Sequence, residues 1–236
     1  MTISKLHLAI LFSCGFSASL SATESTSLVG TVSHLRGELV SLEMDSDSRR
    51  ALTKNSAVNE GDLLITAKQS YARIKFTDGG NLIIRPNSEI RIENYRFKTD
   101  APEQDRYTLN LLKGSLRSIT GLIGKRNPDR QLTYTSHATI GIRGTHFGLL
   151  LCAQEQDCID ETNLAGQVPD AGLYIDVMEG AVTAINDGGR QQISAGQYSH
   201  IENNTRVARI LTAEEAVRVG IPSSMVGDTI EEDCLD

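Results

Sequence analysis

The sequence predicts an all-β protein: a single β-rich domain of stacked strand-turn-strand units, like a sandwich or a β-roll, with one short helix near the C-terminus. Three observations lead to this prediction. Apolar and polar residues alternate with a period of two in several segments, glycines recur within runs of β-forming residues, and Asp-Gly turns separate neighbouring runs. A chain of 236 residues is long enough to bury a substantial core in such a domain.

The clearest strand pair lies in the first half of the chain. Ala72, Ile74 and Phe76 alternate with polar residues, and Asp78-Gly79-Gly80 then turns the chain towards Leu82. A three-residue loop places Phe76 opposite Leu82 and keeps the apolar face continuous. We therefore expect this loop, with a glycine in the left-handed conformation.

A second extended segment, residues 134–148, packs Gly141, Gly144 and Gly148 among β-forming residues. Glycine weakens a strand because it loses backbone entropy and packs no side chain. Repeated glycines therefore mark bends, bulges or close contact with another backbone or ligand. We expect a strand whose backbone is closely approached.

Only the C-terminal end has a helical signature. Thr212 and Glu215 form a capping box for residues 213–219, Gly220 follows the last turn, and Pro222 would stop the helix. We expect residues 202–236 to form a tail that contains this short helix.

Residues 1–22 are typical of a secretory signal peptide: Lys5 precedes a short apolar stretch, and small residues follow up to Ala22. The apolar stretch is shorter than the roughly 20 residues needed to cross a bilayer, and no later stretch is longer. We therefore expect a periplasmic, cell-surface or secreted protein without a transmembrane helix. Cleavage near Ser21 or Ala22 is the first interpretation. The alternative is a lipid anchor on Cys14, which lies in a loose lipobox.

The charge of the remaining chain is acidic. Removal of residues 1–22 removes one Lys and no acid, which leaves 22 basic and 30 acidic residues and a net charge of −8. Binding to nucleic acid or to anionic lipid normally needs a net basic face. Both are therefore disfavoured as partners.

Three cysteines remain beyond the signal region: Cys152, Cys158 and Cys234. In an oxidising compartment a local disulfide between Cys152 and Cys158 is the simplest assignment, worth about 2 kcal/mol for so short a ring. Cys234 is left over near the terminus. A zinc site made by Cys152, Cys158 and a distant histidine is the alternative, although the spacing is wider than usual for zinc ligands. We expect no metal and no cofactor.

A local group of basic residues stands out in the acidic chain. It contains Lys113, Arg117, Lys125, Arg126, Arg130 and Arg143. If the fold gathers them, they could bind a carboxylate or phosphate group through charge-assisted hydrogen bonds. The alternative is a solvated face on which they pair with local acids. Our candidate binding residues are Arg117, Lys125, Arg126, Arg143 and His146.

The order of several short motifs resembles the FecR-like domain family. The matching segments include Arg36-Gly37-Glu38-Leu39-Val40, Glu60-Gly61-Asp62, Leu112-Lys113-Gly114-Ser115-Leu116-Arg117, Ala138-Thr139-Ile140-Gly141-Ile142-Arg143-Gly144-Thr145 and Glu179-Gly180-Ala181-Val182. The resemblance covers residues 28–201 and implies a bacterial extracytoplasmic β-rich module.

The namesake architecture of that family places this module after a membrane helix and a cytoplasmic segment that controls a sigma factor, and it receives a signal from an outer-membrane transporter. The present sequence has neither a membrane helix nor that cytoplasmic segment, so we expect a stand-alone exported member. It also departs from the family at the ends of the Ala-Thr-Ile-Gly run, where Ser136-His137 and His146 replace a Pro-Thr pair and an acid.

No catalytic signature is present in the sequence. A Gly-x-Ser-x-Gly elbow and a zincin motif are both missing, and a Ser-His-Asp triad is defined by geometry that sequence does not show. We therefore expect a non-enzymatic recognition module that binds an envelope protein or a glycan. The alternative is an envelope hydrolase with an unrecognised active site that uses His146.

Overall fold

A computed structural model describes residues 27–43, 48–222 and 225. The signal-peptide residues 1–22, the lipid-anchor candidate Cys14 and the leftover Cys234 lie outside these ranges. Most of the described chain is strand. The strands are β1 (Leu28–Arg36), β2 (Leu39–Glu43), β3 (Ser48–Leu52), β4 (Ala57–Asn59), β5 (Leu63–Thr66), β6 (Tyr71–Phe76), β7 (Asn81–Ile84), β8 (Glu89–Arg96), β9 (Arg106–Ile119), β10 (Gln131–Tyr134), β11 (Thr139–Cys152), β12 (Gly172–Asn186), β13 (Gly189–Ser194), β14 (Tyr198–Ile201) and β15 (Arg209–Ile210).

Helix is scarce in the described part of the chain. It consists of one α-helix, α1 (Leu122–Arg126), and of the 3₁₀ turns η1 (Pro102–Gln104), η2 (Pro128–Arg130) and η3 (Glu155–Cys158). The prediction of an all-β domain is therefore confirmed.

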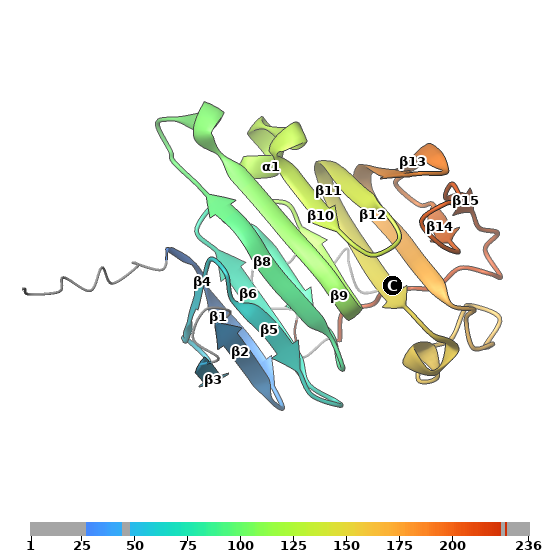
Figure 1. Cartoon of the computed structure of the whole chain (residues 1–236), viewed down its shortest axis with the longest axis horizontal. Coiled ribbons are helices and arrows are strands. Elements are labelled where there is room, and N and C mark those ends of the chain that lie inside the picture. The colour runs from blue at the N-terminus through green and yellow to red at the C-terminus, as the bar shows by residue number, and fades with distance from the viewer. Residues whose placement is uncertain (1–26, 44–47, 223–224, 226–236) are drawn as a thin grey trace, which may run out of the picture.

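Strand β9 organises the sheet because it is long enough to serve two sets of neighbours (Figure 1). Its first half pairs with β8 on one side and, in parallel, with β10 on the other, while its second half pairs with β7 and β11. The change of partner falls at Gly114, whose backbone φ is +77°. A Cβ at this position would lie 2.7 Å from the carbonyl oxygen of Asn87, so the close approach of β9 to the turn between β7 and β8 requires glycine.

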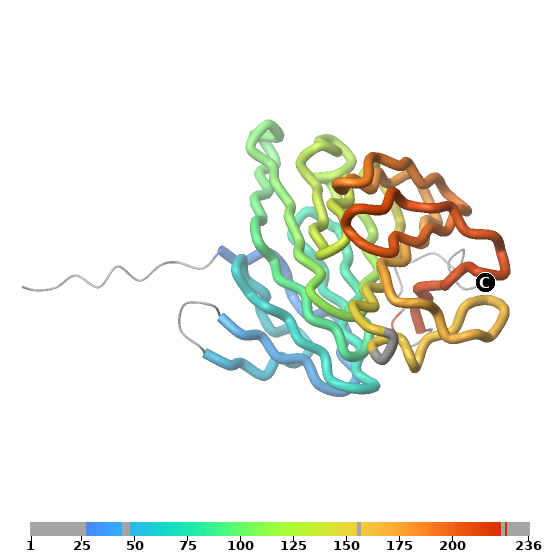
Figure 2. Tube along the Cα trace, turned by 45° about the vertical axis from the view of Figure 1, so that its right-hand side comes forward, coloured from blue at the N-terminus to red at the C-terminus, as the bar shows by residue number. Residues whose placement is uncertain are grey.

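The second half of the molecule is built on the antiparallel pair β11 and β12, which are in register along almost their whole length. Strand β12 also pairs with β14 through its first half and with β13 through its second half. The loop of residues 153–171, here called the disulfide loop, links β11 to β12. Figure 2 shows it (yellow to orange) beside the C-terminal segment in red.

One hydrophobic core joins both halves, and it follows the period-two pattern of the strands. On β6 the residues Ala72, Ile74 and Phe76 point into it, and on β12 so do Leu173, Ile175 and Val177. The core also holds a triad of aromatic rings in which the centroid of Phe76 lies 5.4 Å from that of Tyr95 and 4.9 Å from that of Tyr107. The alternation that predicted these strands therefore marks the buried face.

The β6–β7 hairpin corrects the predicted register. Leu82 pairs with Ile74 rather than with Phe76, and the loop is Thr77-Asp78-Gly79, with Gly79 at φ +84°. The loop length and its left-handed glycine are as expected. The shift by two residues keeps the apolar face intact, and it is fixed by the Asp78 carboxylate, which accepts hydrogen bonds from the amides of Gly80 and Ile123.

The expected C-terminal helix is wrong. Residues 213–215 form only a turn and residues 216–222 are not helical, although Thr212 and Glu215 make both capping-box hydrogen bonds. The segment runs along the outer face of the sheet instead, where Val217 and Val219 are buried against Leu150, Tyr174 and the two cysteines. Burial of these valines outweighs a weak local helix signal, because most helix stability comes from tertiary packing.

Candidate functional site

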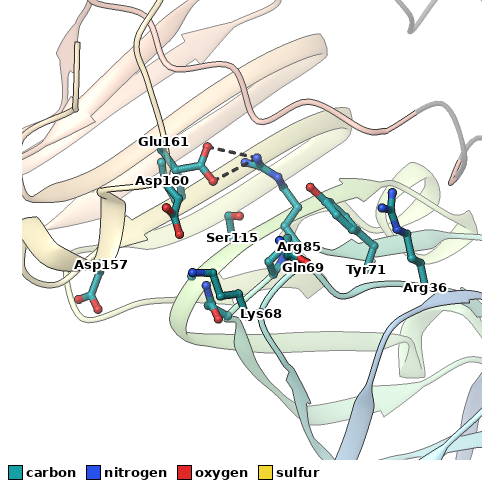
Figure 3. A pocket seen from close by; sticks show the side chains of 13 residues that line it. Arg36, Lys68, Gln69, Tyr71, Arg85, Ser115, Asp157, Asp160 and Glu161 are labelled. Atoms are coloured by element: carbon teal, nitrogen blue, oxygen red, sulfur yellow. Dashed lines mark hydrogen bonds and ion pairs between the residues drawn. The ribbon is translucent and has the colours of Figure 1, made fainter. Parts of the chain in front are cut away.

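A cleft of about 560 Å³ opens between the sheet and the disulfide loop, and we call it the charged cleft (Figure 3). Its walls come from segments far apart in the sequence: the end of β1, the turn before β6, the residue after β7 and the disulfide loop. The two walls differ in charge. Basic side chains come from the N-terminal half of the molecule, and acidic side chains come from the loop.

The basic wall contains Arg36, Lys68 and Arg85. Arg36 is the last residue of β1, Lys68 lies in the turn between β5 and β6, and Arg85 directly follows β7. The side chains of Arg36 and Lys68 are exposed, whereas that of Arg85 is only 13% exposed. Tyr71, the first residue of β6, places its ring between Arg85 and Arg36 (Figure 3).

The acidic wall contains Asp157, Asp160 and Glu161, all from the disulfide loop. The loop is held by a disulfide between Cys152 and Cys158, whose Cα atoms are 5.6 Å apart. The predicted disulfide is therefore confirmed, and the zinc alternative for these cysteines is wrong. Both cysteines are buried, so the base of the acidic wall is anchored to the sheet.

Two ion pairs tie the acidic wall to the sheet. Glu161 pairs with Arg85 at 3.1 Å, and Asp157 pairs with Lys113 on β9 at 3.2 Å. Each pair is partly exposed and contributes at most about 1 kcal/mol. They connect the loop to β9 and to the residue that follows β7.

Three charged side chains at the cleft are left over once these pairs are made. Within the described ranges, the side chains of Arg36, Lys68 and Asp160 form no ion pair and no hydrogen bond with another residue. All three residues are exposed. Each wall therefore keeps charge that a ligand can neutralise.

Strained backbone lies at the rim of the cleft. Three non-glycine residues in the described chain have left-handed backbone angles, and two of them, Gln69 at φ +59° and Asn87 at φ +54°, line the cleft. Asparagine tolerates this region, but glutamine rarely adopts it. Such strain is found preferentially at functional sites, where the surrounding structure holds it in place.

Arg117, a candidate from the sequence, lies in the interior rather than at the cleft. Its side chain is 2% exposed and forms an ion pair with Asp176 on β12. The pair holds the C-terminal segment, because Arg117 Nε donates to the carbonyl oxygen of Val219 at 2.6 Å and the Val219 amide donates to Asp176 at 3.1 Å. Burial raises the pKa of Asp176, and the neighbouring Arg117 opposes that shift.

His146, the second candidate on this face, is 4% exposed. Burial, followed by the positive charge of Arg117, lowers its pKa to about 4. The imidazole is therefore neutral at physiological pH. Arg117 and His146 are the two predicted site residues that the fold brings close together.

Arg126 and Lys125 lie on α1, away from that pair. Arg126 forms an ion pair with the buried Asp105 at 2.7 Å, and its guanidinium carbon lies 4.9 Å from the ring centroid of Phe97. Lys125 is exposed. Arg126 therefore has structural partners, which leaves Lys125 as the accessible cation of this helix.

Arg143 lies at a break in the β11 ladder. Its register with Ala181 on β12 is interrupted before His146, and the following Gly144 has φ +55°. Arg143 is exposed at this bend. Lys113 and Arg126 are at least partly exposed and pair with acids, as the alternative interpretation of a solvated face expects, whereas Arg117 pairs with its acid in a buried position.

Comparison with known protein families decides the affiliation of this fold. The family described as FecR protein matches residues 62–183, which is more than half of the chain. The chain belongs to the FecR family. The matched FecR segment contains Lys68, Arg85 and the whole acidic wall of the cleft, and Arg36 lies before it.

The FecR chain is also similar to solved structures. Two crystal structures of a proposed anti-sigma factor from Parabacteroides distasonis ATCC 8503 align with TM-scores of 0.44 at 12% and 13% sequence identity. Each alignment covers 65% of this chain, which spans 60% of the other protein's length. A search among curated proteins found no match.

Sequence reasoning missed the charged cleft because its residues are dispersed. Arg36, Lys68 and Arg85 are separated by long intervals, and only the fold brings them opposite the disulfide loop. One available signal was the acid-rich stretch that surrounds Cys158, with Asp157, Asp160 and Glu161 in close succession.

Neither a metal centre nor a membrane-spanning helix is found in the described residues. No three His, Cys, Asp or Glu side chains come together there in a way that could hold a metal ion. The helices of this part of the chain are too short and too polar to cross a bilayer.

Proposed function

We propose that this FecR-family chain is an exported, non-enzymatic recognition module of the bacterial envelope that binds a protein partner in the charged cleft. The observation that carries the proposal is the pair of oppositely charged walls, each with a side chain that has no partner of its own among the described residues. Complementary charge gives binding sites their specificity. A protein segment offers both carboxylates and amino groups, whereas a neutral glycan offers neither.

Export is part of the proposal and has two supports. The signal-peptide pattern of residues 1–22 is one, and the disulfide is the other, since disulfides persist in oxidising compartments. We further propose residues 28–201 as the recognition domain and residues 202–236 as its tail. FecR membership supports a sensing or regulatory use of the bound state.

The enclosure of His146 supports a non-enzymatic role. A general base must come within hydrogen-bond reach of its substrate, and this ring is almost entirely buried. Its lowered pKa follows from the same enclosure. Binding therefore ranks above hydrolysis, the alternative function.

Capture from envelope extract tests the proposal. Mature protein, Lys68→Glu and the control Lys54→Glu would each be immobilised; Lys54 is exposed in the turn between β3 and β4. We expect a protein that wild type and Lys54→Glu retain and that Lys68→Glu loses. Capture of nothing, or equal capture by all three, would contradict the proposal.

The intact mass of the exported protein, measured with and without reductant, tests the export part. We expect cleavage near Ser21 or Ala22 and a mass that rises by two hydrogens on reduction of Cys152 and Cys158. A protein that keeps its first 22 residues would contradict export, and a lipid on Cys14 would show the lipoprotein alternative.

A further inference from the structure

The charges that line the charged cleft define the kind of ligand it can take. The lining includes three basic residues, Arg36, Lys68 and Arg85, and three acidic residues on the opposite wall, so the cleft presents both signs of charge. A polyanion would be repelled by the acidic wall and by the net negative charge of the chain. A simple cation would be repelled by the basic wall. Both classes of ligand are therefore disfavoured.

The two internal ion pairs decide which charges remain for a ligand. Arg85 is engaged by Glu161 and Lys113 is engaged by Asp157. The remaining groups are Lys68 and Arg36 on one wall and Asp160 on the other. In Figure 3 the acids lie together on one side, Arg36 lies on the other, and Lys68 lies between them. A ligand that satisfies both walls must carry a positive and a negative group that are separated from each other.

The size and the floor of the cleft fit a small organic ion of this kind. The volume of about 560 Å³ lies within the range of small-ligand sites, roughly 300 to 1,000 Å³. Tyr71, Pro86 and Leu150 also line the cleft and add apolar atoms to it. Gln69 adds an amide from its strained position at the rim.

We infer that the charged cleft binds a short zwitterionic peptide, with its ammonium group towards Asp160 and its carboxylate towards Lys68 and Arg36. This inference rests on the proposed function, since it takes the charged cleft as the recognition site. It adds that a free peptide of a few residues is itself a ligand, whereas the proposed function requires only a protein partner.

The test combines capped ligands with matched variants. Trialanine, N-acetyl-trialanine and trialanine amide would be titrated by ligand-observed NMR into wild type, Asp160→Asn, Lys68→Gln and the control Lys54→Gln. We expect acetylation and Asp160→Asn each to weaken binding about 5-fold, as for an exposed ion pair, and amidation and Lys68→Gln to do the same. Lys54→Gln should bind as wild type does.

Binding of each capped peptide to the variant that lacks the matching charge tests the predicted orientation of the peptide. Asp160→Asn should bind acetylated and free trialanine equally, because the cap and the variant remove the same interaction, and Lys68→Gln should not distinguish the amide from the free peptide. Undetectable binding of trialanine, equal binding of capped and free peptides, or additive effects in the matched combinations would overturn the inference. If any of these occurs while Lys68→Glu still abolishes capture of an envelope protein, the proposed function stands and only the peptide inference fails. Unchanged unfolding temperatures of the variants would show that their folds are intact.

Discussion

At the scale of single residues, buried charge in this protein organises the backbone. Arg117 and Asp176 pair on the outer face of the sheet and together bind both backbone polar groups of Val219. Gly148 lies between them in the cross-strand row, and a Cβ there would come within 2.5 Å of the Val219 side chain. The missing side chain at Gly148 thus admits the segment that the charged pair holds.

Asp176→Asn tests this arrangement. The substitution removes the negative charge of Asp176 from beside the buried Arg117, and we expect a loss of about 3 kcal/mol in the free energy of unfolding, measured with urea. The control is Asp129→Asn, an exposed acid in η2, which should change little. A loss below about 1 kcal/mol for Asp176→Asn would show that the pair does not hold the segment.

His146 should make the fold sensitive to acid. Its folded-state pKa of about 4 lies below the ordinary value of 6.5, so between these values the unfolded chain binds a proton that the folded chain does not. The contribution of His146 to the free energy of unfolding is therefore fully present above about pH 6.5. It is lost as the pH drops towards 4, by at most roughly 3 kcal/mol.

His146→Gln isolates this contribution. Burial also lowers the pKa values of His137 and His200, so wild type and variant should both lose stability in acid. We expect the loss to be smaller in His146→Gln when urea unfolding is repeated from pH 7 to pH 4. Parallel curves would contradict an enclosed neutral imidazole.

A substitution at the strained residue Gln69 should change the stability of the fold and the affinity for the peptide in opposite directions. Gln69→Gly relieves the left-handed conformation and should raise the free energy of unfolding by up to about 1 kcal/mol. It should also weaken trialanine binding about threefold, because the amide is removed from the rim. Asn55→Gly, at φ +70° in the exposed turn between β3 and β4, is the control and should leave binding unchanged. Equal binding by wild type and Gln69→Gly would remove this residue from the site.

At the scale of elements, the disulfide loop connects stability to the cleft. Replacement of both Cys152 and Cys158 by Ala should cost about 2 kcal/mol, because the reduced chain has more freedom when unfolded. It should also lower the affinity for trialanine, because Asp160 then lies on a looser wall. Urea unfolding and NMR titration measure the two effects, and reductant on wild type should reproduce both. Loss of stability with full affinity would mean that the disulfide does not position the acidic wall.

In the C-terminal segment the local sequence signal predicts the first turn correctly but not the conformation of the residues that follow it. Thr212 and Glu215 form the capping box that the sequence predicts, and the turn that they begin stops after residue 215. The alternation of Val217 and Val219 fits the outer face of the sheet better than a helix. Their partners, Leu150 and Tyr174, lie on strands whose position no local pattern specifies.

At the scale of the whole molecule, the sequence predicts the buried face well and the site poorly. Alternation at Ile74 or Ile175 is a property of a single strand, so it can be read directly. The charged cleft depends on segments that are distant in sequence and lie together only in the folded sheet, in which β9 pairs with four other strands. The sequence identifies the basic group, but three of its members form ion pairs with acids in the fold. The unpaired cations of the charged cleft, Lys68 and Arg36, do not belong to that group.

A charge exchange across the charged cleft would show whether two oppositely charged walls recognise the ligand. The affinity for trialanine would be measured for wild type, Lys68→Glu, Asp160→Lys and the double variant, all of which alter exposed side chains. We predict that each single variant binds at least about 5-fold more weakly than wild type. The double variant should recover only part of the affinity, because the peptide can bind in the reverse direction but its ammonium group then faces the retained Arg36. Single variants that bind as wild type does, or a double variant that shows the sum of both losses, would contradict recognition by two oppositely charged walls.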